Sequence, residues 1–168
     1  DGFPLRIDAV NDGSMNEVQV SQAIASYLEK VGIDMEVNLI PRSMFLELTS
    51  PKDMRSSFFM ARWGDSSGEG VVILNDMVYT YEGKPGFGEG NKGKYSNPEV
   101  DRLLDIATEI EDKQERAEAV KEIDRITREE AAYIPLFFGN NIFGTRDHIE
   151  YTPKANGVLH AWDVTFVE

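Results

Sequence analysis

The chain has 168 residues, a length typical of one domain. It contains 30 acidic and 17 basic residues, and the formal net charge of −13 argues against nucleic acid or anionic lipid as a partner, because both need a basic surface. With no cysteine and only 2 histidines, the chain cannot form disulfides, thiolate metal sites or multi-histidine sites, so we expect no cofactor and no metal. No apolar run is long enough for insertion into a membrane.

The first forty residues have the pattern of a strand, a helix and a second strand. Apolar and polar residues alternate over 5–10 and again over 34–40, and each alternation predicts a strand. Between them, Ser14 and Glu17 have the spacing of a capping box, and apolar residues follow at helical intervals as far as Gly32. Because a helical crossover joins the two strands, we expect them to be parallel.

The next segments predict one more strand and two more helices. Residues 43–49 have the composition of a short helix, and the apolar run 56–63 suits a central strand buried on both faces. Residues 71–81 are apolar enough for a helix. The glycine-rich stretch 83–93 is predicted to be a surface loop.

Two further helices and a strand are predicted in the last part of the chain. Asn97 precedes a proline at a first helical position, and Asp112 begins a second helix with a mixed-charge outer face. Residues 132–138 have the composition of a strand, in which Pro135 marks an edge, a bulge or the strand start. The remainder, 139–168, offers only short strand-like pieces. The expected fold class is α/β, with a mixed, mostly parallel central sheet flanked by helices.

Several motifs along the chain, taken in order, resemble one family. They are the stretch 27–37, Arg62-Trp63-Gly64 with the polar loop 65–69, the stretch 95–104, Arg116 followed by Glu122 and 132–136, and residues 155–158. They resemble the C-terminal lobe of the family 5 extracellular solute-binding proteins of ABC-type importers, which carry oligopeptides, dipeptides, glutathione and nickel complexes. This resemblance implies that residues 1–168 form a single periplasmic-binding-protein-like lobe of a larger two-lobed protein. The last roughly 25 residues would pack within this lobe or against the missing N-terminal lobe.

The resemblance also implies a function. The chain would be part of the substrate-binding component of an importer, which captures a peptide or similar small polar solute in a cleft between lobes and delivers it to the membrane permease subunits. It would carry no catalysis and would work in the periplasm or outside the cell, with a lipid anchor on the missing N-terminal part. Two other classes stay open: a ligand-sensing module of a cytosolic regulator, and a small hydrolase that uses Asp65 or Glu69.

The loop after the third predicted strand contains most of the candidate ligand-binding residues. Ligands of open α/β sheets bind beyond the carboxyl ends of the strands, where residues 62–69 are expected to lie. In the peptide-binding relatives a tryptophan at this strand end lines the cleft, and Trp63 matches it. An aspartate three residues further on holds the ligand's amino terminus there, whereas this chain has Ser66 at that position and Asp65 one residue earlier. We expect Asp65, Ser66 and Ser67 to contact the ligand.

Each candidate also has a structural alternative. Trp63 could close the core at the end of its strand, and Asp65, Ser66 and Ser67 could form a turn with the following backbone. Arg42 follows the second predicted strand, where its guanidinium would bind a ligand carboxylate bidentately or stay in solvent.

Overall fold

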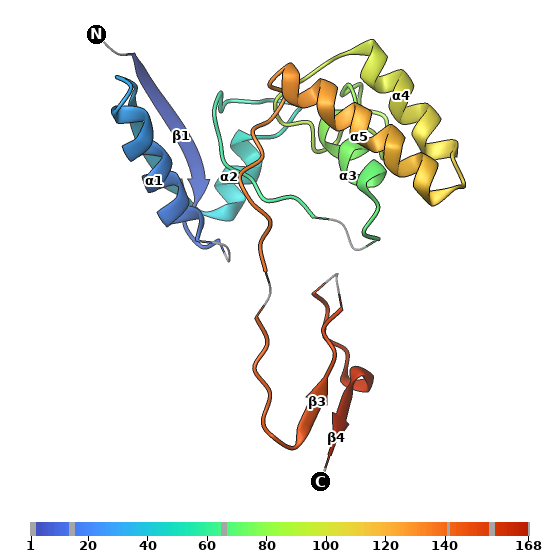
Figure 1. Ribbon diagram of the computed structural model, residues 1–168. Coiled ribbons are helices and arrows are strands. Elements are labelled where there is room, and N and C mark those ends of the chain that lie inside the picture. Colours follow the sequence, from blue (N-terminus) through green and yellow to red (C-terminus); the bar gives the residue numbers. More distant parts are fainter. Residues whose placement is uncertain (1–2, 14–15, 65–66, 141, 155–156, 168) are drawn as a thin grey trace.

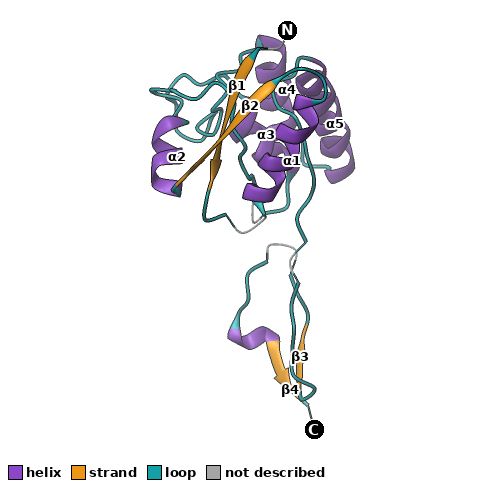
Figure 2. Ribbon diagram, turned by 90° about the vertical axis from the view of Figure 1, so that its left-hand side faces the viewer, coloured by secondary structure: helices purple, strands orange, loops and turns teal. Residues whose placement is uncertain are grey.

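The computed structural model describes residues 3–13, 16–64, 67–140, 142–154 and 157–167. Figures 1 and 2 show a body of helices and strands, from which the C-terminal part of the chain extends as a long arm. The described residues of this arm are 134–140, 142–154 and 157–167. In chain order the elements are β1 (Pro4–Val10), α1 (Glu17–Glu29), β2 (Asp34–Ile40), α2 (Arg42–Leu48), α3 (Gly70–Val78), α4 (Pro98–Glu109), α5 (Lys113–Glu129), β3 (Ile149–Tyr151), a 3-10 turn (Ala161–Asp163) and β4 (Val164–Phe166).

The predicted strand–helix–strand unit at the start of the chain is confirmed. β1 and β2 pair in parallel, with Ile7 opposite Val37, and α1 packs against both strands. Alternation places Ile7, Ala9 and Met35 in the interior, where they meet the apolar side of α1. Glu17 is the first residue of α1, whereas Ser14, its predicted capping partner, lies outside the described residues.

The prediction of a central strand over 56–63 is wrong. This segment touches the sheet through one parallel bridge, between Phe59 and Asp8 of β1. Only Ser56 and Met60 of the segment are buried, so it follows the edge of the sheet and is not covered on both faces. The chain turns away from β1 after Met60, and a single bridged residue cannot form a longer ladder.

Asp8 fixes this edge segment to the sheet. Its side chain is 1% exposed, and it accepts hydrogen bonds from the Asn38 side chain on β2 and from the Ser56 hydroxyl. The Arg6 guanidinium lies 3.3 Å from the same carboxylate. A buried carboxylate is costly unless it is paired, and these partners satisfy it while joining three segments of chain.

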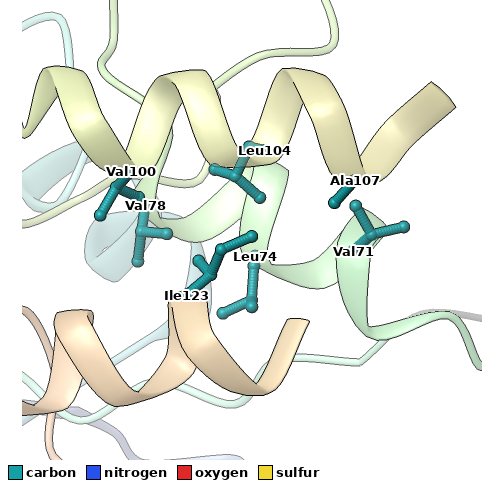
Figure 3. Packing of buried hydrophobic residues seen from close by; sticks show 7 residues of the cluster. All are labelled: Val71, Leu74, Val78, Val100, Leu104, Ala107 and Ile123. Atoms are coloured by element: carbon teal, nitrogen blue, oxygen red, sulfur yellow. The ribbon is translucent and has the colours of Figure 1, made fainter. Parts of the chain in front are cut away.

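Helices α3, α4 and α5 form the second part of the body, and they were predicted. Figure 3 shows their apolar side chains pointing toward one another, from α3 (Val71, Leu74, Val78), α4 (Val100, Leu104, Ala107) and α5 (Ile123). The predicted helix starts are confirmed, because the Asn97 side chain accepts the Glu99 N–H, and the Asp112 side chain accepts the N–H groups of Gln114 and Glu115. Together these contacts fix where both helices begin.

The predicted strand over 132–138 is also wrong, because it forms no strand in the structure. The segment leaves the body as an extended chain with exposed apolar side chains, and Phe138 is 100% exposed. A strand needs a hydrogen-bonding neighbour, and none of the described parts of the chain lies beside it as one. The arm ends in β3 and β4, an antiparallel pair that both ribbon views place away from the body.

The α/β class predicted from the sequence is confirmed. The parallel sheet is smaller than expected, since it consists of β1, β2 and the bridge to Phe59, with α1 packed against it. Within the described ranges, no helix is both long and apolar enough to cross a membrane.

Candidate functional site

Trp63 forms one wall of an open cavity of about 310 Å³ beside helix α3. The described residues that line this cavity are Trp63, Gly64, Val71, Val72, Ile73, Asn75, Asp76, Gly86 and Thr108. They come from the end of the edge segment, from one side of α3, from the glycine-rich loop and from the end of α4. The indole is only partly buried and borders this opening.

Asp76 holds the indole ring by its edge. The Trp63 Nε1–H donates to one carboxylate oxygen of Asp76 at 2.9 Å, and the Gly90 N–H donates to the other at 2.8 Å. The Asp76 side chain, on α3, therefore links the end of the edge segment to the glycine-rich loop. Hydrogen bonds to a charged acceptor are stronger than neutral ones, which makes this a firm connection.

Lys92 lies on the same side of the molecule as this contact. Its ammonium nitrogen is 5.8 Å from the centre of the Trp63 ring, within the range of a cation–π contact. Burial lowers the pKa of Lys92, and the nearby Asp76 carboxylate opposes that effect. The indole thus has one carboxylate and one ammonium near it; both oxygens of the carboxylate accept N–H groups, and Lys92 is not among the described residues that line the cavity.

Of the three predicted ligand-binding residues that the structure describes, Trp63 alone lines the cavity. Asp65 and Ser66 lie outside the described residues. Ser67 is exposed, and its hydroxyl accepts the Glu69 N–H at 3.1 Å, which is the contact of its structural alternative, a turn. Arg42 is exposed at the start of α2 and is not among the described residues that line the cavity.

Glu69, the second acid of the hydrolase hypothesis, is engaged in a structural ion pair. Its carboxylate lies 3.2 Å from the Arg116 guanidinium on α5, and Arg116 also donates to the Ile110 carbonyl at 2.6 Å. These contacts connect the start of α3 with α5. Across the described ranges, no group of 3 or more His, Cys, Asp or Glu residues is placed to hold a metal ion.

Sequence reasoning pointed to Trp63, which borders the cavity, and gave no indication of its neighbours Asp76, Gly90 and Lys92. No local pattern predicts a role for Asp76, since it is one of two neighbouring polar residues in the apolar helix α3. Gly90 is one of several glycines in its loop. Only the packing of that loop against α3 and the strand end brings them to the indole. The one available signal was the glycine-rich composition of 83–93, because glycine permits close approach of backbone to a ring.

The comparison with curated proteins finds distant relatives. The chain is 22% identical to "Oligopeptide-binding protein AppA" of Bacillus subtilis (strain 168) over 147 residues, which are 86% of this chain and 26% of that protein. It is 25% identical to "Probable D,D-dipeptide-binding periplasmic protein DdpA" of Escherichia coli (strain K12) over 130 residues, which are 77% of this chain and 24% of that protein. No protein-family model matches the chain. The chain therefore spans about a quarter of the length of these relatives.

Solved structures of binding proteins have the same fold. The Bacillus subtilis oligopeptide-binding protein AppA, solved in complex with a nonapeptide, aligns with a TM-score of 0.76 and 18% identity over 99% of this chain and 32% of its own. DppA from Helicobacter pylori, in complex with the peptide STSA, aligns with a TM-score of 0.65 and 20% identity over 81% of this chain and 25% of its own. The predicted resemblance to the family 5 solute-binding proteins is confirmed. The match extends to a part of these proteins and supports the α/β lobe fold.

Proposed function

We propose that this chain is one lobe of the substrate-binding component of an ABC-type importer, and that it helps to capture a peptide or similar small polar solute. The observation that supports this most is the open cavity at Trp63, in a fold shared over 99% of the chain with a protein solved around a nonapeptide. The name of the relative DdpA describes a periplasmic protein, which supports a place of action in the periplasm or outside the cell. The remaining, N-terminal lobe would carry any lipid anchor.

In this proposal the ligand closes a clamp. Contacts that exist only when both lobes surround the ligand favour the closed state, and the permease subunits then accept that state. Trp63 supplies a rigid aromatic surface that loses little side-chain entropy on binding. Lys92 places a positive charge near that surface.

The arm fits the same proposal. Its apolar side chains Ile134 and Phe138, which lie in one apolar run, are 68% and 100% exposed, and Ile142 further along is 95% exposed; exposed apolar surface of this kind marks interaction sites. We assign this segment and the β3–β4 hairpin to contacts with the missing lobe.

No observation favours the hydrolase or the regulator. The similar proteins described above are named as binding proteins, and the Glu69 carboxylate is paired with Arg116. We therefore propose that the chain performs no catalysis. The upstream sequence of the gene distinguishes an importer component from a regulator. A signal peptide and a first lobe would support import, whereas a DNA-binding module would overturn the import proposal.

Native mass spectrometry of the full-length gene product with a mixed pool of tripeptides and tetrapeptides tests the proposal. We expect one intact peptide to be retained per molecule, and none to be retained by the 168-residue chain alone at the same concentration. Glu69→Gln serves as the control for hydrolysis, because a binding lobe should retain the same peptides with or without that carboxylate. Failure of the full-length protein to retain peptides, or release of cleaved peptides, would contradict the proposal.

A further inference from the structure

The Trp63 indole is held on more than one side before any ligand is present. Asp76 uses both carboxylate oxygens in this arrangement, one for the Trp63 Nε1–H at 2.9 Å and one for the Gly90 N–H at 2.8 Å. The same Gly90 N–H also lies 3.1 Å from the Asp76 carbonyl oxygen. Turning the ring would therefore break a charge-assisted hydrogen bond.

Gly90 limits the ring by its lack of a side chain. A Cβ atom at this position would lie 2.0 Å from Cζ2 of Trp63 and 2.6 Å from Oδ2 of Asp76. Non-bonded atoms do not approach this closely, so any other residue at this position would displace the ring or break the hydrogen bond between Trp63 and Asp76. The ring and the loop backbone are in direct contact.

The loop that carries Gly90 is itself anchored by hydrogen bonds, which oppose its displacement. Asn91 is 1% exposed, and its side-chain amide donates to the carbonyls of Tyr79 and Tyr95 at 2.9 and 2.7 Å. Its side-chain oxygen accepts the Tyr95 N–H at 2.9 Å. On the other side of Gly90, the Gly88 N–H donates to the Asn75 carbonyl of α3 at 3.0 Å.

We propose that Asp76 and Gly90 are positioning residues, which fix the angle of the Trp63 indole at the cavity before the ligand arrives. An aromatic wall that is already ordered loses less entropy on binding, and a fixed angle selects the ligand groups that can lie against it. The significance for binding rests on the proposed function, in which Trp63 contacts the peptide. The positioning itself is a property of the free chain and is tested separately.

The first arm of the experiment measures the indole in the 168-residue chain. Trp162→Phe leaves Trp63 as the only indole, because the chain has 2 tryptophans. In this background we expect Asp76→Ala and Gly90→Ala to speed exchange of the indole N–H with solvent about tenfold and to weaken its near-ultraviolet circular dichroism. The far-ultraviolet spectrum should stay unchanged. If Asp76→Ala fails to fold, Asp76→Asn keeps one acceptor and should give a smaller change in the same direction.

Gly93→Ala is the matched control, because a Cβ there meets only the Ala132 carbonyl oxygen at 3.8 Å, an ordinary contact. It should leave the indole signals as they are. Unchanged indole exchange in folded Asp76→Ala and Gly90→Ala chains would overturn the inference, whatever the ligand proves to be.

The second arm measures affinity in the full-length protein, for the peptide retained most strongly from the pool of tripeptides and tetrapeptides. Asp76→Ala and Gly90→Ala should weaken binding about tenfold, and Gly93→Ala should not. A freed indole with unchanged peptide affinity would also overturn the inference. If the unmodified protein retains no peptide, the proposed function fails instead, and the indole measurements still decide whether Asp76 and Gly90 position the ring.

Discussion

The helical part of the body and the C-terminal arm differ sharply, although both are rich in apolar residues. Leu104 and Ile123 between the helices are 0% exposed, whereas Phe138 and Ile142 on the arm are 100% and 95% exposed. The helices meet partners that are close in sequence, so their apolar stripes are covered within the described chain. The arm meets no such partner there (Figure 1). Apolar composition thus predicts that a side chain will be buried, and the topology of the chain decides which element buries it.

The largest expected difference between the two regions is in stability. Leu104→Ala should lower the free energy of unfolding of the 168-residue chain by about 2–5 kcal/mol, because it leaves a cavity in the closed helical core. Phe138→Ala should change the free energy of unfolding by less than about 0.5 kcal/mol, because that ring is fully exposed and its removal leaves no cavity. Urea unfolding followed by circular dichroism measures both. Equal losses would show that the arm packs on the body in solution.

A smaller loss is expected from a buried polar anchor. Asn91→Ala should cost about 2 kcal/mol, because the carbonyls of Tyr79 and Tyr95 lose their donor in a buried place. Asn140→Ala on the arm is the control, since that side chain is exposed, and it should have almost no effect. The same urea titration compares the two variants. A neutral Asn91→Ala would mean that water replaces these hydrogen bonds easily.

The smallest expected effect concerns pH at the point where the body meets the arm. Burial and then the hydrogen bond to Asp124, at 2.6 Å, raise the pKa of Tyr133 to about 12. Because the folded pKa is raised above the unfolded value near 10, this contribution to stability is complete below that value and is lost as pH rises toward 12. The loss of folding free energy should reach about 1 kcal/mol at pH ~11.

Tyr133→Phe isolates that contribution. Unfolding measured at several alkaline pH values should show a shallower decline for Tyr133→Phe than for the unmodified chain. Tyr27→Phe, at an exposed position on α1, should leave the decline unchanged. Parallel declines for all three proteins would indicate that Tyr133 ionises as freely in the folded as in the unfolded chain.

Local patterns were enough to predict most of the body. Alternation predicted β1 and β2, and helical spacing with caps predicted α4 and α5. The apolar runs 56–63 and 132–138 were assigned to strands wrongly, because composition does not reveal whether a neighbouring strand is present.

The site was less predictable than the fold. Trp63 was predicted from an expected strand end at 56–63; it borders the cavity although that segment makes only one bridge to the sheet. Its partners Asp76, Gly90 and Lys92 are 13 or more residues away and are brought to it by the packing of a helix and a loop. No local motif records such contacts.

Calorimetry of peptide binding to the full-length protein with and without Trp63→Ala tests the central claim most directly. Tyr27→Ala, which removes an exposed ring that is not among the described residues lining the cavity, is the control. We expect Trp63→Ala to weaken binding by about 1–3 kcal/mol and Tyr27→Ala to leave it unchanged. Unchanged affinity in a folded Trp63→Ala protein would contradict the claim that this indole forms a wall of the ligand site.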